Sequence, residues 1–207
     1  MKYIYPPRVE NKIAPSSLSS FEEMEMFIAE PKLNGSSMSV YFSDGAKEIK
    51  LMNRHKEPIL CKLDLEELKK LYVGPGEMIL VGEYMNKNKK DETDKFWNIK
   101  FVVWDIIKLN SKHLIGTSFL ERHQMLSGMY HPIASKQDLL TQITPNCFLI
   151  TIHKAGFLKL YNRITQIDMY EGLVLKKISG KLEDGFKENN NSKTQIKCRK
   201  ETKNYLF

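Results

Sequence analysis

The chain has 207 residues, 42% of them hydrophobic, so it can bury the core of a sizeable domain, and its composition excludes an intrinsically disordered protein. Lysine and arginine number 32 against 25 aspartate and glutamate residues, and the formal net charge of +7 favours a polyanionic partner such as nucleic acid. No stretch approaches the ~20 apolar residues of a membrane span, and three scattered cysteines exclude a disulfide framework. We therefore expect a cytoplasmic protein that does not enter a membrane.

The first half of the chain predicts an arm, two helices and four strands. Residues 1–19 are punctuated by proline and serine, which predicts an extended N-terminal arm. Ser20 and Glu23 form a capping-box pattern, and apolar residues then recur at helical spacing through Ile28, which predicts a short helix leading toward Lys32. Residues 63–72 predict an amphipathic helix that ends at a Gly-Pro-Gly sequence. Strands are predicted at 37–42, 48–52, 78–85 and 101–107.

The second half continues in the same manner. Ser118 and Glu121 form another capping box, which predicts a helix over 120–130, and 135–143 is predicted to form a further helix. Strands are predicted at 147–153, 167–177 and 194–200, with a polar loop at 181–193. Many strands interrupted by few helices predict an α+β fold, with largely antiparallel sheets flanked by helices, in a single domain over residues 1–207.

Lys32 lies just before a predicted strand in the run EPKLNG, with Gly35 three residues after it. Glycine lets backbone approach a bulky ligand closely, and a lysine whose pKa is lowered can act as a nucleophile. The same lysine could simply contact a phosphate. The run by itself leaves both interpretations open.

Four further runs place charged or aromatic residues on predicted strands. Glu83 ends an apolar strand, where a carboxylate is costly unless it meets a cation, a metal or a hydroxyl. In FVVWD, alternation puts Phe101 and Trp104 on opposite faces, and either ring could stack on a base or pack in a core. The other runs are EGLVLK, from Glu171 to Lys176, and KCRK, in which Lys197 and Arg199 share one strand face.

In this order, these runs and an arginine at position 54 resemble the covalent nucleotidyltransferase superfamily, which comprises ATP-dependent DNA ligases, RNA ligases and mRNA capping enzymes. The resemblance extends from about residue 28 to residue 200. The segment LIGTSFLERHQML additionally resembles phage and viral DNA ligases. The fold implied is the adenylation domain of ATP-dependent ligases.

The resemblance implies a role for each residue. Lys32 would take AMP from ATP, Glu171 would hold the catalytic metal, and Lys197 would act with them. Phe101 would stack on the adenine, with Trp104 as a substitute, and Glu83 would bind a ribose hydroxyl and assist at the metal. The complete set implied for nucleotide binding is Glu30, Asn34, Gly35, Arg54, Glu83, Phe101, Lys176, Lys197 and Arg199.

The implied chemistry begins with a lysine that must lose its proton. The reference pKa of lysine is ~10.4, so neighbouring cations are needed to favour the neutral amine. Mg²⁺, or Mn²⁺ in its place, would offset the phosphate charge and orient pyrophosphate as the leaving group. AMP would pass from Lys32 to a 5′-phosphate end, and a 3′-hydroxyl would then displace it and seal the strand.

The sequence also departs from the family pattern. Ser37 occupies a position where DNA ligases usually carry arginine and phage nick-sealing RNA ligases asparagine, Asn34 replaces a common aspartate, and Arg199 replaces a second lysine. Only seven residues follow Lys200, which predicts that no OB-fold domain is present. We expect this domain to bind nucleic acid without the help of a second domain, through its basic surface and the arm residues Lys2, Arg8 and Lys12.

The leading hypothesis is a monomeric ATP-dependent ligase that seals 5′-phosphate/3′-hydroxyl breaks in duplex nucleic acid, with a slight preference for nicked DNA. An RNA ligase that accepts RNA or mixed RNA/DNA ends is the main alternative. An mRNA guanylyltransferase, which would label Lys32 with GMP, an inactive nucleic-acid-binding module, and a basic structural protein with accidental motifs remain open.

Overall fold

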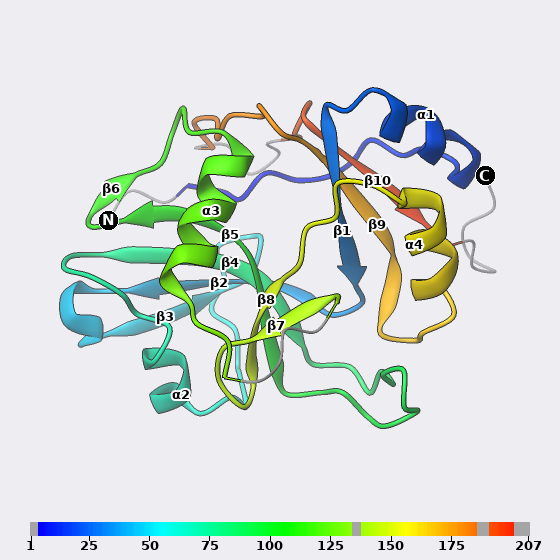
Figure 1. Cartoon of the computed structure of the whole chain (residues 1–207). Helices are drawn as coiled ribbons and strands as arrows, with labels where there is room; N and C mark the ends of the chain where they lie inside the picture. The colour runs from blue at the N-terminus through cyan, green and yellow to red at the C-terminus, as the bar shows by residue number, and fades with distance from the viewer. Residues whose placement is uncertain (1–3, 134–137, 186–190, 201–207) are drawn as a thin grey trace.

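The computed structural model describes residues 4–133, 138–185 and 191–200, and the structural statements below refer to these residues. Two β-sheets form the framework (Figure 1). The larger sheet has the order β3-β2-β4-β5-β8-β7, with β6 paired to β5, and its neighbours are antiparallel except for β5 and β8. Its strands are β2 (Ser36–Phe42), β3 (Ile49–Met52), β4 (Met78–Met85), β5 (Lys100–Leu109), β6 (Lys112–His113), β7 (Leu140–Gln142) and β8 (Cys147–Ile150).

The smaller sheet has three antiparallel strands in the order β1-β9-β10. They are β1 (Phe27–Leu33), β9 (Tyr170–Lys177) and β10 (Gln195–Arg199). In the central strand, Gly172 has a φ of 138°, and a Cβ atom there would overlap the carbonyl oxygen of Cys198. Glycine is therefore required at this position for β10 to approach β9 closely.

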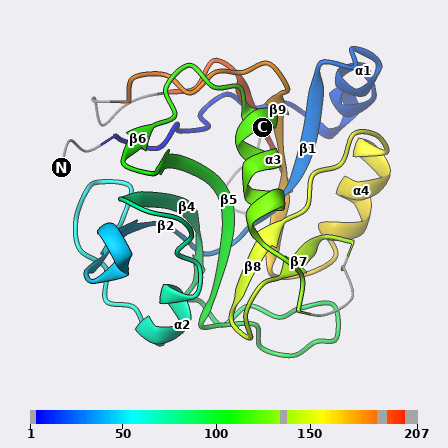
Figure 2. The same ribbon diagram turned by 60° about the vertical axis from the view of Figure 1, so that its left-hand side comes forward.

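Short helices cover the sheets. Helix α3 lies against β5, whereas α1 and α4 pack together beside the smaller sheet (Figures 1 and 2). None of the helices in the described ranges is long and apolar enough to cross a membrane. The helical segments are η1 (Pro15–Ser17), α1 (Leu18–Glu23), η2 (Asp44–Ala46), α2 (Leu65–Lys69), α3 (Phe119–Met129) and α4 (Phe157–Ile164).

The side chains of β5 alternate between two hydrophobic cores. Phe101 and Val103 are fully buried in the larger core, which packs on the larger sheet. Val102, on the opposite face, belongs to the smaller core, which is shared with α1, α4 and the smaller sheet. Trp104 is only partly buried and contacts both cores. Strand β5 therefore forms a wall between the two halves of the molecule, with Trp104 at their boundary.

The described part of the N-terminal arm is extended and lies along β10. The amide of Ile13 donates to Lys197 O at 3.1 Å, and the amide of Lys197 donates to Asn11 O at 2.9 Å. Farther along, the amide of Ser192 donates to Arg8 O at 2.8 Å. The predicted arm is thus tied to the smaller sheet as far as Ile13, and helical structure begins at Pro15, earlier than predicted.

The predicted α+β class and the capping box of Ser118 and Glu121 are confirmed. The helix predicted from Ser20 through Ile28 is wrong at both ends, because α1 starts at Leu18 and a positive φ of 54° at Glu25 follows its last turn. Phe27 and Ile28 instead begin β1.

The helix predicted at 135–143 is wrong where it can be compared, because residues 140–142 form β7. Antiparallel pairing with β8 outweighs the local helical pattern there. Residues 135–137 of that prediction lie outside the described ranges.

Glu22 ties α1 to the start of α4. Its two carboxylate oxygens accept the backbone N–H groups of Gly156 and Phe157, each at 2.8 Å, so it caps a helix that is distant in sequence. Since an N-terminal cap contributes about 0.5–2 kcal/mol, Glu22→Ala should lower the free energy of unfolding by about 1 kcal/mol or more in urea titrations. The adjacent exposed Glu23→Ala should change it by less than about 0.5 kcal/mol. Equal effects of the two substitutions would contradict this role of Glu22.

Candidate active site

A pocket of about 590 Å³ is lined by both sheets, by the extended arm and by the loop after β3. Eleven residues are predicted from the sequence to form the site, and nine of them line this pocket. These nine are Glu30, Lys32, Gly35, Arg54, Glu83, Glu171, Lys176, Lys197 and Arg199. The fold thus brings residues from the beginning, middle and end of the chain to one cavity, while the role of each remains a prediction.

Lys32 and Arg199 meet at the carboxylate of Glu171. In the smaller sheet, both residues are register partners of Gly172, one from each side of β9. Lys32 Nζ lies 2.5 Å from Glu171 Oε2, and Arg199 Nη2 lies 3.0 Å from the same oxygen. Because Glu171 precedes that glycine, its carboxylate is placed between two cations that come from different strands.

Glu83 lies on β4 and lines the same pocket as this cluster. Its Oε1 accepts the backbone N–H of Gly35 at 2.9 Å, which fixes the turn between β1 and β2. A Cβ atom at Gly35 would lie 2.8 Å from Glu83 Cγ, so glycine is needed for this close approach. Burial raises the pKa of Glu83 to about 7, against the attraction of Lys32.

Glu30 and Lys176 form a buried ion pair at the inner wall, with Lys176 Nζ 2.7 Å from Glu30 Oε2. Glu30 is 3% exposed, and its other oxygen, Oε1, has no hydrogen-bond partner among the described residues. Burial raises the pKa of Glu30 to about 7, although Lys176 acts to lower it. An unpaired acceptor on a pocket wall is costly unless a ligand supplies a donor.

The arm contributes an acid that faces the basic end of the pocket. Glu10 Oε2 lies 3.4 Å from Lys197 Nζ, and Glu10 Oε1 lies 3.6 Å from Arg8 Nε. Burial lowers the pKa of Lys197, and Glu10 acts in the opposite direction. In the loop after β3, Arg54 Nε lies 3.0 Å from His55 Nε2, and both residues line the pocket. Arg8, Lys197 and Arg54 thus bring three cations to the pocket, and Glu10 lies beside two of them.

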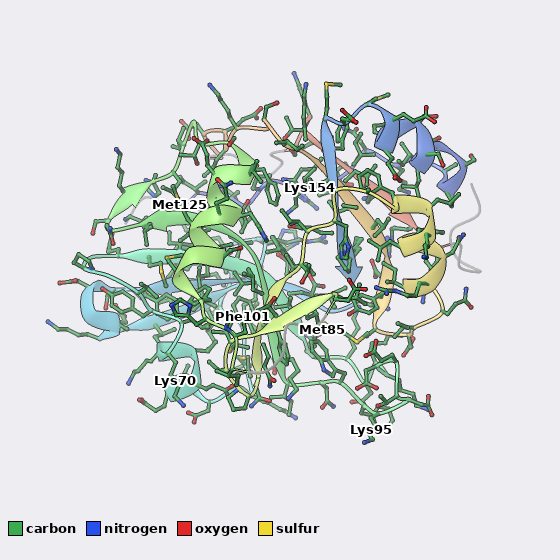
Figure 3. The ribbon with its side chains drawn as sticks, viewed as in Figure 1. Lys70, Met85, Lys95, Phe101, Met125 and Lys154 are labelled. Carbon is green, nitrogen blue, oxygen red and sulfur yellow. The ribbon has the colours of Figure 1, made fainter. Side chains whose placement is uncertain are left out.

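Two predicted residues do not line the pocket. Phe101 is fully buried in the larger core (Figure 3), so the prediction that its ring stacks on adenine is wrong. Alternation along β5 turns Trp104 to the pocket instead, beside Ile150 and Val174. Asn34 lies next to the pocket, where its Oδ1 accepts a hydrogen bond from Lys87 Nζ at 3.1 Å.

Sequence reasoning missed Glu10 and Gln195 as pocket residues. Glu10 carries no local motif, and its place depends on pairing between the arm and β10, which no sequence pattern indicates. The alternation of the 194–200 strand could have indicated Gln195, because it puts this residue on the same face as Lys197 and Arg199.

The pocket offers oxygen ligands to a metal ion. No group of three or more His, Cys, Asp and Glu side chains in the described part of the chain is arranged to hold a metal. Glu83 and Glu171 both line the pocket, however, and Mg²⁺ commonly takes one or two carboxylates together with phosphate oxygens and water. This donor set fits a metal ion that arrives with a nucleotide.

The fold is that of the nucleotidyltransferase domain of ATP-dependent ligases. The family model described as the ATP-dependent DNA ligase domain matches residues 11–195, and the chain belongs to this family. No curated protein matches the chain.

Solved structures agree with this fold. Mycobacterial DNA ligase D complexed with ATP is 12% identical, with a TM-score of 0.63 over 95% of this chain and 60% of that one. The ATP-dependent DNA ligase of bacteriophage T7, in complex with ATP, is 14% identical, with a TM-score of 0.61 over 94% and 68%. An archaeal ATP-dependent RNA ligase is 13% identical, with a TM-score of 0.54 over 94% and 48%. The chain therefore spans about three fifths of the DNA ligase D chain that it matches.

The raised pKa of Glu83 predicts a pH dependence of stability. Its folded-state pKa of about 7 exceeds the ordinary 4.5, so its contribution is fully present below about pH 4.5 and is lost as the pH rises through about 7. Glu83→Gln removes this titration. The decrease in unfolding free energy between pH 5 and pH 8 should therefore be smaller in the variant than in the wild type, by about 1–2 kcal/mol.

Urea titrations at four pH values measure this change. Glu92→Gln, at an exposed glutamate of the β4–β5 loop, is the matched control and should keep the wild-type slope. An unchanged slope in Glu83→Gln would show that Glu83 titrates normally in the fold.

Proposed function

We propose that this chain is an ATP-dependent polynucleotide ligase that carries AMP on Lys32 and seals 5′-phosphate/3′-hydroxyl breaks in duplex nucleic acid, with DNA preferred. One observation carries the proposal. The Lys32 amine lines a large pocket, and its Nζ lies 2.5 Å from Oε2 of the Glu171 carboxylate. Family membership and a fold shared with DNA ligases support the same activity.

The inner wall of the pocket suits an adenine base. Trp104, Ile150 and Val174 provide apolar surface against which a base can stack. Glu30 Oε1 is a buried acceptor without a partner in the described chain, and the exocyclic amino group of adenine is a donor that would satisfy it. Guanine presents a carbonyl at the equivalent position, so this acceptor favours ATP over GTP.

The outer part suits the ribose and the phosphates. Glu83 offers a carboxylate to a ribose hydroxyl, and Lys197 and Arg199 offer cations to the phosphates. Glu83 and Glu171 would also hold Mg²⁺ or Mn²⁺, which would offset phosphate charge when bound. A phosphate that binds Lys197 would either share its ammonium with the Glu10 carboxylate or displace that carboxylate.

The Lys32–Glu171 contact provides the first proton transfer. The ammonium of Lys32 gives its proton to Glu171 Oε2, and the neutral Nζ attacks the α-phosphorus of ATP. A P–N bond forms as the P–O bond to pyrophosphate breaks, and the electron pair leaves with pyrophosphate. A 5′-phosphate oxygen next attacks the same phosphorus, and Nζ leaves and regains a proton. Finally a 3′-hydroxyl attacks the 5′-phosphorus, AMP leaves, and the strand is joined.

Basic residues around the pocket mouth suit a nucleic-acid backbone. Arg8 and Arg54 line the pocket, and Lys12 lies on the arm opposite Lys197. Lys2, the third arm cation expected to contact nucleic acid, lies outside the described residues. An RNA ligase remains the second candidate, because Ser37 lines the pocket where an arginine is usual in DNA ligases. The monomeric state and the cytoplasmic location stay predictions.

Covalent labelling tests the proposed intermediate. Incubation with labelled ATP and Mg²⁺ should attach AMP to the wild-type chain, and Lys32→Arg should lose at least about a thousandfold of the labelling rate, because a guanidinium keeps the charge but is not a nucleophile. Lys50→Arg, on β3 outside the pocket, is the matched control and should label normally. Label from GTP alone would indicate a guanylyltransferase, and no label from either nucleotide would indicate a binding module.

Nick sealing tests the substrate. Four duplexes, with DNA or RNA on each side of the nick, should show the fastest sealing for DNA on both sides. Binding of the nicked duplex should weaken with salt, and Arg54→Gln should reduce the slope of log K against log salt by about one, as expected for the loss of one phosphate contact. Faster sealing of RNA ends would favour the RNA ligase, and an unchanged salt slope would remove Arg54 from the interface.

A further inference from the structure

Four buried charged residues lie at and behind the inner wall of the pocket, where the base is proposed to bind. Glu30, Asp105, Lys176 and Arg122 are all less than 5% exposed. Arg122 binds Asp105 through two hydrogen bonds, Nε to Oδ1 at 2.7 Å and Nη2 to Oδ2 at 2.9 Å. Only the Glu30–Lys176 pair reaches the pocket. A buried charge of this kind must be held by fixed partners, because the protein interior cannot reorganise around it as water does.

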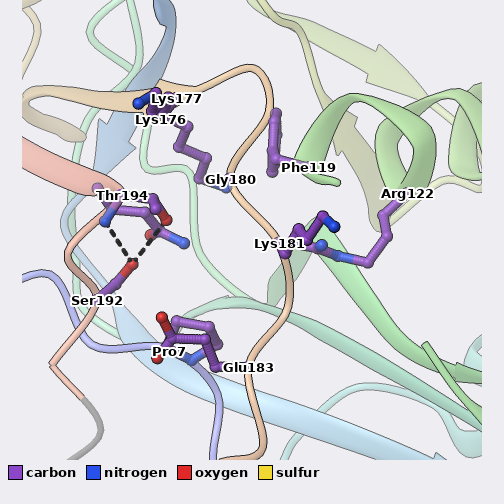
Figure 4. A pocket seen from close by; sticks show the side chains of 11 residues that line it. Pro7, Phe119, Arg122, Lys176, Lys177, Gly180, Lys181, Glu183, Ser192 and Thr194 are labelled. Carbon is purple, nitrogen blue, oxygen red and sulfur yellow. Dashed lines mark hydrogen bonds between the residues drawn. The ribbon is translucent and has the colours of Figure 1, made fainter. Parts of the chain in front are cut away.

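The ring of Phe119 lies beside both cations. Lys176 Nζ is 4.3 Å from the ring centroid, within the range of a cation–π contact, and Arg122 Cζ is 5.9 Å from it. Figure 4 shows Phe119, Lys176 and Arg122 around the same crevice. The Lys176 ammonium therefore has two attractive partners, Glu30 Oε2 in an ion pair at 2.7 Å and the face of Phe119, while it makes no hydrogen bond within the described chain.

A backbone hydrogen bond fixes the position of Phe119 relative to the strand that carries Lys176. Phe119 is the first residue of α3, and its amide donates to Gly180 O at 2.8 Å, in the loop that follows β9. The capping box of Ser118 and Glu121 fixes the start of the helix from the other side. The crevice beside the ring has a volume of about 10 Å³, room for at most one water. The ammonium thus has little space to move on the side of the ring.

We propose that Phe119 is a positioning residue for base selection, because it holds the Lys176 ammonium on Glu30 Oε2 and leaves Glu30 Oε1 as the acceptor for the amino group of adenine. The inference rests on the proposed nucleotide pocket. Without the ring, the ammonium can shift toward the base and donate to the carbonyl of guanine, so discrimination between the two bases weakens. Phe119 does not line the base pocket and acts only through Lys176.

Equilibrium binding of AMP and GMP, measured by calorimetry, tests this role separately from covalent chemistry. The wild type should bind AMP more tightly than GMP. Phe119→Leu, which keeps an apolar side chain but lacks a ring, should lower that preference at least tenfold. Phe119→Tyr, which keeps the aromatic face, should stay within about threefold of the wild type. Phe157→Leu, at a fully buried phenylalanine in the smaller core, controls for general loss of packing and should keep the wild-type preference.

A double-variant cycle tests whether the effect passes through Lys176. If Phe119 acts by holding this ammonium, Phe119→Leu/Lys176→Met should have the same AMP preference as Lys176→Met alone. Circular dichroism checks that each variant is folded, and Phe119→Met replaces Phe119→Leu if the latter is not. A folded variant without the ring that keeps the wild-type preference, or effects that add in the double variant, would overturn the proposal. Absence of label on Lys32 would overturn the proposed ligase function, but the measured preference for AMP over GMP, and the effect of Phe119 on it, would still hold.

Discussion

The close approach of β1 and β10 to β9 at Gly172 is the constraint on which the site depends. Lys32 and Arg199 are both register partners of this glycine, and Glu171 precedes it. A larger residue would collide with the backbone of β10 and would also have to adopt a φ of 138°, so the two cations would no longer meet at one carboxylate. The need for glycine at position 172 thus determines how closely Lys32, Glu171 and Arg199 lie in the candidate active site.

Opposite charges are paired at both ends of the pocket. At the outer end, the two carboxylates of Glu171 and Glu10 face more cations than they can neutralise, because Glu171 binds both Lys32 and Arg199, and Glu10 lies beside Lys197. At the inner end, Lys176 neutralises Glu30. A nucleotide carries negative charge at its phosphates and hydrogen-bond donors at its base, so its phosphates can bind the excess cations at the outer end and its base can complete the acceptor at the inner end. The acids thus stabilise the pocket before ATP arrives, and the cations remain available to its phosphates.

Sequence patterns predicted the fold class and nine of the residues that line the candidate pocket, because their signals are local. Lys32, Glu83, Glu171 and Lys197 lie in short runs whose residue types and order carry the resemblance. The face that β5 turns to the pocket was not predictable, because alternation distinguishes Phe101 from Trp104 without showing which side is the core. The place of Glu10 depends on pairing with residues more than 180 positions away. The edge strand β7 likewise depends on β8 rather than on its own sequence.

The proposed activity requires a covalent bond between the Lys32 amine and AMP. Intact-mass measurement of the wild-type protein after incubation with ATP and Mg²⁺, followed by peptide mapping, detects this bond. We expect a mass increase of one AMP group, located on Lys32 and removed by added pyrophosphate. An adduct on another residue, or an unmodified chain that still seals nicks, would contradict it.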